Sequence, residues 1–93
     1  MSTLTLAVKG VYFNQIKSGD KTEEYRLCTP YWAYRLVYRE YDQIVLTLGY
    51  PKRDDAKRRL VLPWRGYTIK TITHPHFGPN PVSVYAINVK VNA

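Results

Sequence analysis

The chain is organised around the stretch GDKTEEYR, residues 19–26, which holds a turn, two cations and three acids. A glycine at its start is typical of a helix stop. The residues that follow alternate as in a strand, so Glu24 and Arg26 are predicted to leave one face roughly 6.5–7 Å apart. Lys21 lies at the mouth of the turn. Such a Lys/Glu/Arg set can bind a phosphate or polarise a small polar group. The alternative is a surface ion-pair ladder, worth about 0–1 kcal/mol per pair.

Regular elements are predicted on both sides of this stretch. Residues 3–8 alternate between polar and apolar side chains, which indicates a half-buried strand. Residues 11–18 have apolar side chains at helical spacing and indicate a short helix that ends at the glycine. The charged strand itself is expected at about residues 21–27.

A second helix is predicted from Thr29 to about residue 40. Threonine can cap the first turn, and Pro30 suits the first helical position. One face carries Trp32 and Leu36, with Ala33 and Val37 alongside, and these residues are expected in the core. A second stripe consists of tyrosines at helical spacing, namely Tyr31, Tyr34, Tyr38 and Tyr41. Beside arginine this stripe could stack bases, but we expect it to pack against a sheet with its hydroxyl groups outward.

The second half of the chain predicts three more strands and a basic segment. Strands are expected at residues 42–48, 67–73 and 82–91. Residues 52–60 are the most basic stretch. Asp54 or Asp55 is expected to cap a short helix there, whose C-terminal end carries Lys57, Arg58 and Arg59. Residues 63–66 are predicted to form a turn with Trp64 exposed, and residues 74–81 a proline-rich loop.

Length and composition indicate the fold class. With 93 residues and 45% apolar content, the chain is expected to form a single domain, residues 1–93, around one core. About five strands with two or three short helices predict an α+β fold. In so small a domain the sheet is expected to close into a mixed β-barrel, because closure removes exposed strand edges. No apolar run reaches the roughly 18 residues of a membrane span, so we expect no membrane partner.

The net charge of +7 is unevenly distributed along the chain. All seven acids lie within residues 1–55, whereas residues 56–93 carry six lysines and arginines and no acid. This asymmetry indicates a polyanionic partner, most simply nucleic acid, although a basic half also promotes solubility. The lone Cys28 excludes an internal disulfide, so a reducing, cytoplasmic location is expected.

Signals for other chemistry are weaker. His74 and His76 flank a proline, but no acid or cysteine follows them, so a metal site would have to recruit carboxylates from the first half. Cys28 is far in sequence from both histidines, which disfavours a thiol nucleophile. No phosphate-binding glycine loop or serine elbow is present in the sequence. We expect no metal site and no cofactor, and a divalent metal only if the protein is a nuclease.

The run IKSGDKTEEYR, residues 16–26, resembles the signature of the ASCH domain (activating-signal-cointegrator homology domain) of the small single-domain bacterial or phage type. That pattern is Gly-x-Lys-x-x-Glu-x-Arg after an opening strand and a short helix, and it is met by Gly19, Lys21, Glu24 and Arg26. The predicted order of elements also agrees, so the resemblance covers most of the chain. It implies a PUA-like β-barrel whose cleft is lined by the motif, with RNA or a nucleotide-like small molecule as the partner.

The wider family includes amidohydrolases that remove an acyl group from the N4 amine of acylated cytidine, using a lysine, a threonine nucleophile and a glutamate. Lys21 matches the lysine, but Glu24 stands at the threonine position, and no acid follows Asp55 to match the glutamate. The resemblance therefore supports the cleft better than this chemistry. Other members are ribonucleases, for which Lys21 and Glu24 would be the catalytic residues and Arg26 a phosphate clamp.

We therefore expect an RNA- or nucleotide-binding module with a Lys/Glu/Arg cleft. The alternative is a hydrolase, either a ribonuclease or the less favoured acylcytidine amidohydrolase. A third reading is a protein-interaction module that uses the basic face. Besides Lys21, Glu24 and Arg26, the expected ligand contacts are a phosphate track and stacking side chains, namely Arg58, Arg59, Trp64, Arg65 and Tyr67.

Overall fold

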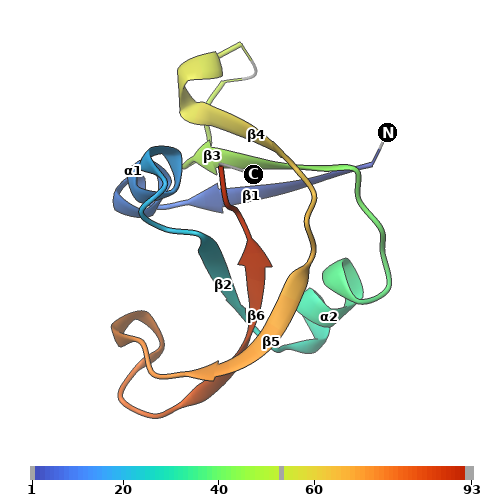
Figure 1. The fold of residues 1–93 in the computed structure, drawn as a ribbon, viewed down its shortest axis with the longest axis vertical. Coiled ribbons are helices and arrows are strands. Elements are labelled where there is room, and N and C mark those ends of the chain that lie inside the picture. The colour runs from blue at the N-terminus through green and yellow to red at the C-terminus, as the bar shows by residue number, and fades with distance from the viewer. Residues whose placement is uncertain (1, 53, 92–93) are drawn as a thin grey trace.

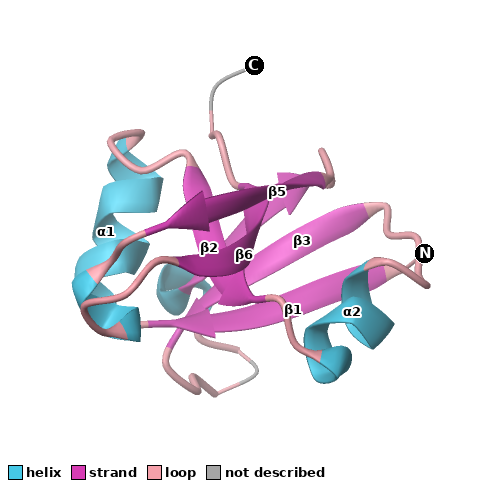
Figure 2. Ribbon diagram, turned by 90° about the horizontal axis from the view of Figure 1, so that it is seen from below, coloured by secondary structure: helices cyan, strands magenta, loops and turns pink. Residues whose placement is uncertain are grey.

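The computed structural model describes residues 2–52 and 54–91 and has an α+β fold (Figures 1 and 2). Its elements in chain order are β1 (Thr3–Val8), α1 (Gly10–Ser18), β2 (Glu23–Leu27), α2 (Pro30–Leu36), β3 (Gln43–Leu48), the 3-10 helix η1 (Ala56–Arg58), β4 (Arg59–Pro63), β5 (Tyr67–Ile72), the 3-10 helix η2 (Pro75–Phe77) and β6 (Val82–Asn88). The predicted α+β class is confirmed, with one strand more than expected among the described residues.

The first sheet has the strand order β1-β3-β4. β1 and β3 are parallel, with Thr3 opposite Gln43 and Val8 opposite Leu48. Parallel neighbours need a long crossover connection, which α1, β2 and α2 provide here. β4 pairs with β3 in the antiparallel sense. The prediction that β1 is half-buried is confirmed, because Leu4 and Leu6 are buried while Thr3 and Thr5 are exposed.

The second sheet has the order β2-β6-β5, and both of its pairings are antiparallel. β6 is the central strand and its middle is buried on both faces, from Val84 to Ile87. This strand fixes the motif strand beside it, because Glu24 lies opposite Ile87 and Arg26 opposite Tyr85. The charged residues of β2 are thus held by a rigid, buried neighbour.

One apolar cluster joins the two sheets and both α-helices. It includes Leu6 of β1, Phe13 of α1, Leu36 of α2, Ile44 of β3 and Ile87 of β6, all of them at most 2% exposed. Figures 1 and 2 both show α1 and α2 at opposite sides of the molecule, with the strands between them. Apolar side chains from every layer thereby leave water together, which is the dominant favourable term in folding.

The second helix is shorter than predicted. Its start is confirmed, because the backbone N–H of Trp32 donates to Thr29 Oγ1 at 3.4 Å and Pro30 occupies the first turn. Its end is at Leu36, not near residue 40. The hydroxyl group of Tyr41 donates to the carbonyl oxygen of Arg35 at 2.6 Å. A continued helix would use that oxygen for the N–H group four residues later, so the tyrosine replaces the helical bond.

The expected packing of the tyrosine stripe is wrong for three of its four members. Tyr31, Tyr34 and Tyr38 are between 61% and 76% exposed, whereas Tyr41 packs against the core cluster. Tyr38 and Tyr41 lie beyond the end of the short helix, so the four side chains do not share one helical face. Within the helix, the face that meets the core is that of Trp32, Ala33 and Leu36, which leaves Tyr31 and Tyr34 exposed. Val37, expected in the core, is also exposed.

The basic segment also differs from the prediction. The expected helix is only η1, and the Asp55 side chain makes no capping hydrogen bond. Arg59 instead begins β4, which pairs with β3 so that Leu60 lies opposite Leu46 and Leu62 opposite Ile44. The apolar run from Leu60 to Leu62 has no visible alternation, and only pairing with β3 gives Val61 an outward and Leu62 an inward position.

The predicted barrel is not confirmed. The described strands form two separate three-stranded ladders that do not close on each other. The chain has a radius of gyration of 13.2 Å. Within residues 2–52 and 54–91, no helix is long and apolar enough to cross a bilayer.

Candidate functional site

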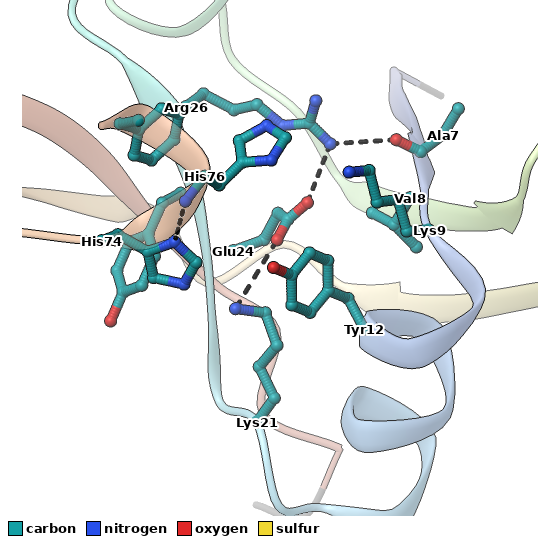
Figure 3. Close-up of a pocket in the computed structure, with 11 residues that line it drawn as sticks. Ala7, Val8, Lys9, Tyr12, Lys21, Glu24, Arg26, His74 and His76 are labelled. Carbon is teal, nitrogen blue, oxygen red and sulfur yellow. Dashed lines mark hydrogen bonds and ion pairs between the residues drawn. The ribbon is translucent and has the colours of Figure 1, made fainter. Parts of the chain in front are cut away.

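A hollow of about 190 Å³ opens where the end of β1, the start of α1, β2 and the η2 segment meet. All three charged motif residues, Lys21, Glu24 and Arg26, line this hollow (Figure 3). We call it the motif hollow. Tyr25 of the motif strand also lines it, and the other lining residues come from the end of β1, from α1 and from the η2 segment: Ala7, Val8 and Lys9, then Tyr12, then His74, His76 and Phe77.

Glu24 is the buried acid of the motif hollow, with only 7% of the residue exposed. Its Oε2 accepts a hydrogen bond from Arg26 Nη2 at 2.9 Å, and its Oε1 lies 3.7 Å from Lys21 Nζ. The strand alternation that predicted a shared face for Glu24 and Arg26 is therefore confirmed. A carboxylate this far from water is stable only when it is paired and hydrogen-bonded, and here two cations provide that.

Backbone geometry places Lys21. Gly19 adopts φ = 89°, a left-handed conformation that ends α1 as predicted. The N–H of Lys21 then donates to the carbonyl oxygen of Gln15 at 3.0 Å. Its Nζ lies 5.0 Å from the ring centre of Tyr12 and 4.9 Å from that of Tyr25, within cation–π range. Lys21 is thus held by a carboxylate and two aromatic rings, and does not extend freely into solvent.

Arg26 links the motif strand to the first sheet. Besides Glu24, its Nη2 donates to the carbonyl oxygen of Ala7 at 3.0 Å. Its guanidinium carbon lies 5.2 Å from the ring centre of Trp32 on α2. Its Nε is buried without a hydrogen-bond partner among the described residues. Figure 3 shows the other terminal nitrogen pointing away from Glu24. Arg26 is therefore both a tether between sheets and one wall of the hollow.

The two histidines also line the motif hollow, although no pattern in the sequence predicted them there. Nδ1 of His74 accepts a hydrogen bond from the backbone N–H of His76 at 3.1 Å, which fixes that ring. The His74 ring meets Tyr12 and Tyr25 edge-on, with ring centres 6.4 and 6.3 Å apart. Only the folded chain brings the η2 loop to a motif about fifty residues earlier. No local pattern marked Tyr12 or either histidine as a lining residue.

Tyr25 adds a neutral hydroxyl group near the motif hollow. Burial raises the pKa of Tyr25 above its usual 10.0, and the negative charge of Glu23 raises it further. The hydroxyl donates to Glu23 Oε1 at 3.3 Å, and the same oxygen accepts a 2.8 Å bond from Lys70 Nζ. Tyr25 thus keeps its proton at neutral pH and presents an aromatic ring, not a second anion.

The other predicted site residues do not line the motif hollow. Arg58 is an exposed side chain paired with Asp55 at 3.3 Å, and Arg65 is exposed. Arg59 is a structural tether, because its Nη2 donates to the carbonyl oxygens of Pro51 and Lys52. Trp64 and Tyr67 are half-buried and pack against the core cluster. The prediction that Trp64 is exposed is therefore wrong.

Metal ligands are not grouped in the described part of the chain. Residues 2–52 and 54–91 contain no cluster of three or more histidine, cysteine, aspartate or glutamate side chains placed to hold an ion. Although both histidines line the motif hollow, Glu24 is the only acid among its described lining residues, and it is engaged by Lys21 and Arg26.

Comparisons of the chain with protein-family models, with curated proteins and with solved structures gave no match. The resemblance to the ASCH domain therefore stays a prediction carried by four residues, Gly19, Lys21, Glu24 and Arg26.

The arrangement in the motif hollow suits a flat, polar ligand. The buried carboxylate can accept a hydrogen bond, two cations can donate, and tyrosine and histidine rings can contact a planar group. The hollow has room for one ring system and not for a duplex. Its chemistry therefore suits a planar group with hydrogen-bond donors better than a simple anion, which would meet Glu24 as a like charge.

Proposed function

We propose that this chain is an ASCH-like, PUA-like module that binds RNA or a nucleotide in the motif hollow. One observation carries the proposal: Glu24 is buried in the hollow beside Lys21 and Arg26, under aromatic walls. In this arrangement Glu24 accepts a hydrogen bond from an amine on the edge of a base. Lys21 and Arg26 contact the base edge or a phosphate, and Tyr12 and His74 flank the ring.

A panel of nucleotides tests the role of Glu24. Cytidine, adenosine and guanosine monophosphates each carry a base amine, whereas uridine monophosphate carries none. We expect calorimetric titration to show at least roughly tenfold weaker binding of the uridine compound, because its carbonyl oxygen would face the Glu24 carboxylate with no proton between them. Equal affinity for all four would remove the base amine from the proposal.

Lys21→Ala tests the hollow itself. We expect nucleotide affinity to fall by at least about tenfold, because one charge-assisted contact is lost. The fold should persist, with a melting temperature within a few degrees of the wild type, since Glu24 keeps its shorter 2.9 Å ion pair with Arg26. Lys17→Ala is the matched control, because Lys17 is exposed on α1 and does not line the hollow. Joint loss of folding and binding would indicate a structural ion-pair network instead.

A ribonuclease is the second candidate function, and the placement of His74 and His76 favours it. Imidazole is the commonest general acid or base, and Lys21 could stabilise charge on a phosphate.

Hydrolysis of acylated cytidine is disfavoured, because a carboxylate at position 24 attacking an amide would form a high-energy mixed anhydride. We expect no release of acetate from N4-acetylcytidine, and at most slow cleavage of labelled single-stranded RNA that His76→Ala abolishes. Rapid deacetylation that is abolished by Lys21→Ala would make the amidohydrolase the favoured function.

A further inference from the structure

A second hollow adjoins the first and shares a wall with it. It has a volume of about 250 Å³, and Ala7 and Arg26 line both hollows. Its other aromatic and charged side chains are Tyr31, Trp32, Arg35 and Tyr50. We call it the aromatic hollow. A ligand that leaves the motif hollow over Arg26 therefore enters a surface made of aromatic rings and a second arginine.

Arg35 is the second cation of this surface, and it is half-buried. Its guanidinium carbon lies 4.8 Å from the ring centre of Trp32 and 5.5 Å from that of Tyr31. Its hydrogen bonds go to neutral acceptors, the Tyr31 hydroxyl at 3.2 Å and the Thr5 carbonyl at 3.4 Å. No carboxylate of the described residues pairs with it, and no acid lines the aromatic hollow.

Two arginines on one indole ring repel each other. Arg26 and Arg35 both lie within 5.2 Å of the Trp32 ring centre, and only Arg26 has a carboxylate partner in the described chain. A bound anion above this ring would relieve the repulsion and accept from both guanidinium groups. Planar guanidinium groups beside exposed aromatic rings are the chemistry that single-stranded nucleic acids meet in their binding grooves, where bases stack and phosphates pair.

We propose that the aromatic hollow binds the next nucleotide of a single RNA strand whose first base occupies the motif hollow. This inference rests on the proposed function and adds to it a minimum ligand of two linked nucleotides. The linking phosphate lies against Arg26 and Arg35, and the second base stacks on Tyr31 or Tyr50, which are 61% and 95% exposed. Because stacking does not depend on a particular base edge, this second position has little base preference.

The test compares cytidine monophosphate with a tetracytidylate of RNA, using calorimetry for the former and fluorescence anisotropy for the latter. For the wild type we expect the oligonucleotide to bind at least about tenfold more tightly, since a stack and a phosphate contact are added. Arg35→Gln should lower only the oligonucleotide affinity and should flatten its salt dependence by roughly 0.7 in slope. Tyr50→Ala, at a side chain too exposed to affect folding, should lower oligonucleotide affinity by roughly fivefold if it stacks a base.

Controls separate this inference from simple charge attraction. Arg39→Gln removes an arginine that lies 5.5 Å from the Tyr34 ring centre but lines neither hollow, and it should leave oligonucleotide affinity nearly unchanged. Inorganic polyphosphate carries the charge without bases and should compete weakly. Tetradeoxycytidylate tests whether the ribose hydroxyl contributes. Competition by polyphosphate as strong as that by RNA would overturn base stacking and leave a non-specific anion surface.

The outcomes distinguish the inference from the function on which it depends. If the monophosphate and the oligonucleotide bind equally well, or if Arg35→Gln weakens both alike, the aromatic hollow does not bind a second nucleotide. The proposed nucleotide site in the motif hollow is then still supported. If neither ligand binds, the proposed function fails and the second position fails with it. If the oligonucleotide binds in a way that responds to Arg35→Gln but not to Lys21→Ala, the aromatic hollow stands and the motif hollow does not.

Discussion

Two of the ion-pair groups in this chain have opposite surroundings. In the motif hollow, the side chain of Glu24 is 9% exposed and its partners Lys21 and Arg26 are 14% and 23% exposed. In the basic segment, Asp55 and Arg58 pair at 3.3 Å with side chains 35% and 59% exposed. Water screens the second pair, so it contributes little to stability. Burial, and not the number of charges, separates a candidate site from a solvated surface.

The source of this difference is what covers each group. The Glu24 group lies between β2, the end of β1 and α1, with aromatic rings above Lys21. The Arg58 pair lies on η1, three residues long, before a strand at the edge of its sheet. A sheet and a helix together remove water from charged groups, whereas an isolated turn does not.

The largest expected effect is on stability, and it distinguishes Glu24 from Asp55. Glu24→Ala leaves a half-buried Arg26 and Lys21 without their carboxylate, and we expect the free energy of unfolding to fall by about 3 kcal/mol. Asp55→Ala should change it by less than about 1 kcal/mol, because its pair is exposed. Urea unfolding followed by tryptophan fluorescence measures both. Equal losses would mean that burial does not distinguish the two groups. Glu24→Gln, which keeps the shape and one acceptor, should give an intermediate value.

A smaller effect is expected for the basic segment, and it should concern salt, not folding. If Arg58 and Arg65 contact phosphates, the charge reversals Arg58→Glu and Arg65→Glu should each flatten the salt dependence of single-strand RNA binding by roughly 0.7 in slope. The measurement is anisotropy titration over a series of salt concentrations. An unchanged slope would remove this segment from the interface. Arg59→Ala is not an equivalent variant, because Arg59 holds the Pro51–Lys52 backbone and its loss should destabilise the fold.

The smallest effect concerns the exposed pair of Lys70 and Glu23, at 2.8 Å. The hydrogen bond with Glu23 raises the pKa of Lys70 above its usual 10.5. Because the pKa of Lys70 is higher in the folded state, the pair stabilises the fold fully at a pH below the pKa of the unfolded state. This stabilisation is lost as the pH rises through the pKa of the folded state. The difference in melting temperature between wild type and Lys70→Gln should therefore be small, constant from pH 7 to about pH 10, and smaller at higher pH. A difference that grows above pH 10 would contradict the assigned pair.

Much of the first half of the chain was predictable from local pattern. The turn at Gly19, the shared face of Glu24 and Arg26, and the start of α2 at Thr29-Pro30 each depend on residues within a few positions of one another. Such short-range signals act on backbone dihedral angles and strand alternation directly. The end of α2 was not predictable in this way, because it depends on a hydroxyl group from Tyr41 that lies outside the helix.

What the sequence by itself determined is the α+β class, the basic second half and a charged strand whose acid and arginine share one face. What only the tertiary structure decided is which residues surround that face. The parallel pairing of β1 with β3 joins segments forty residues apart, and the η2 loop brings His74 and His76 to Lys21 across a larger gap. The two separate sheets and the position of β4 were decided in the same way. Long-range pairing is chosen by the burial of a common core, which no local window of sequence contains.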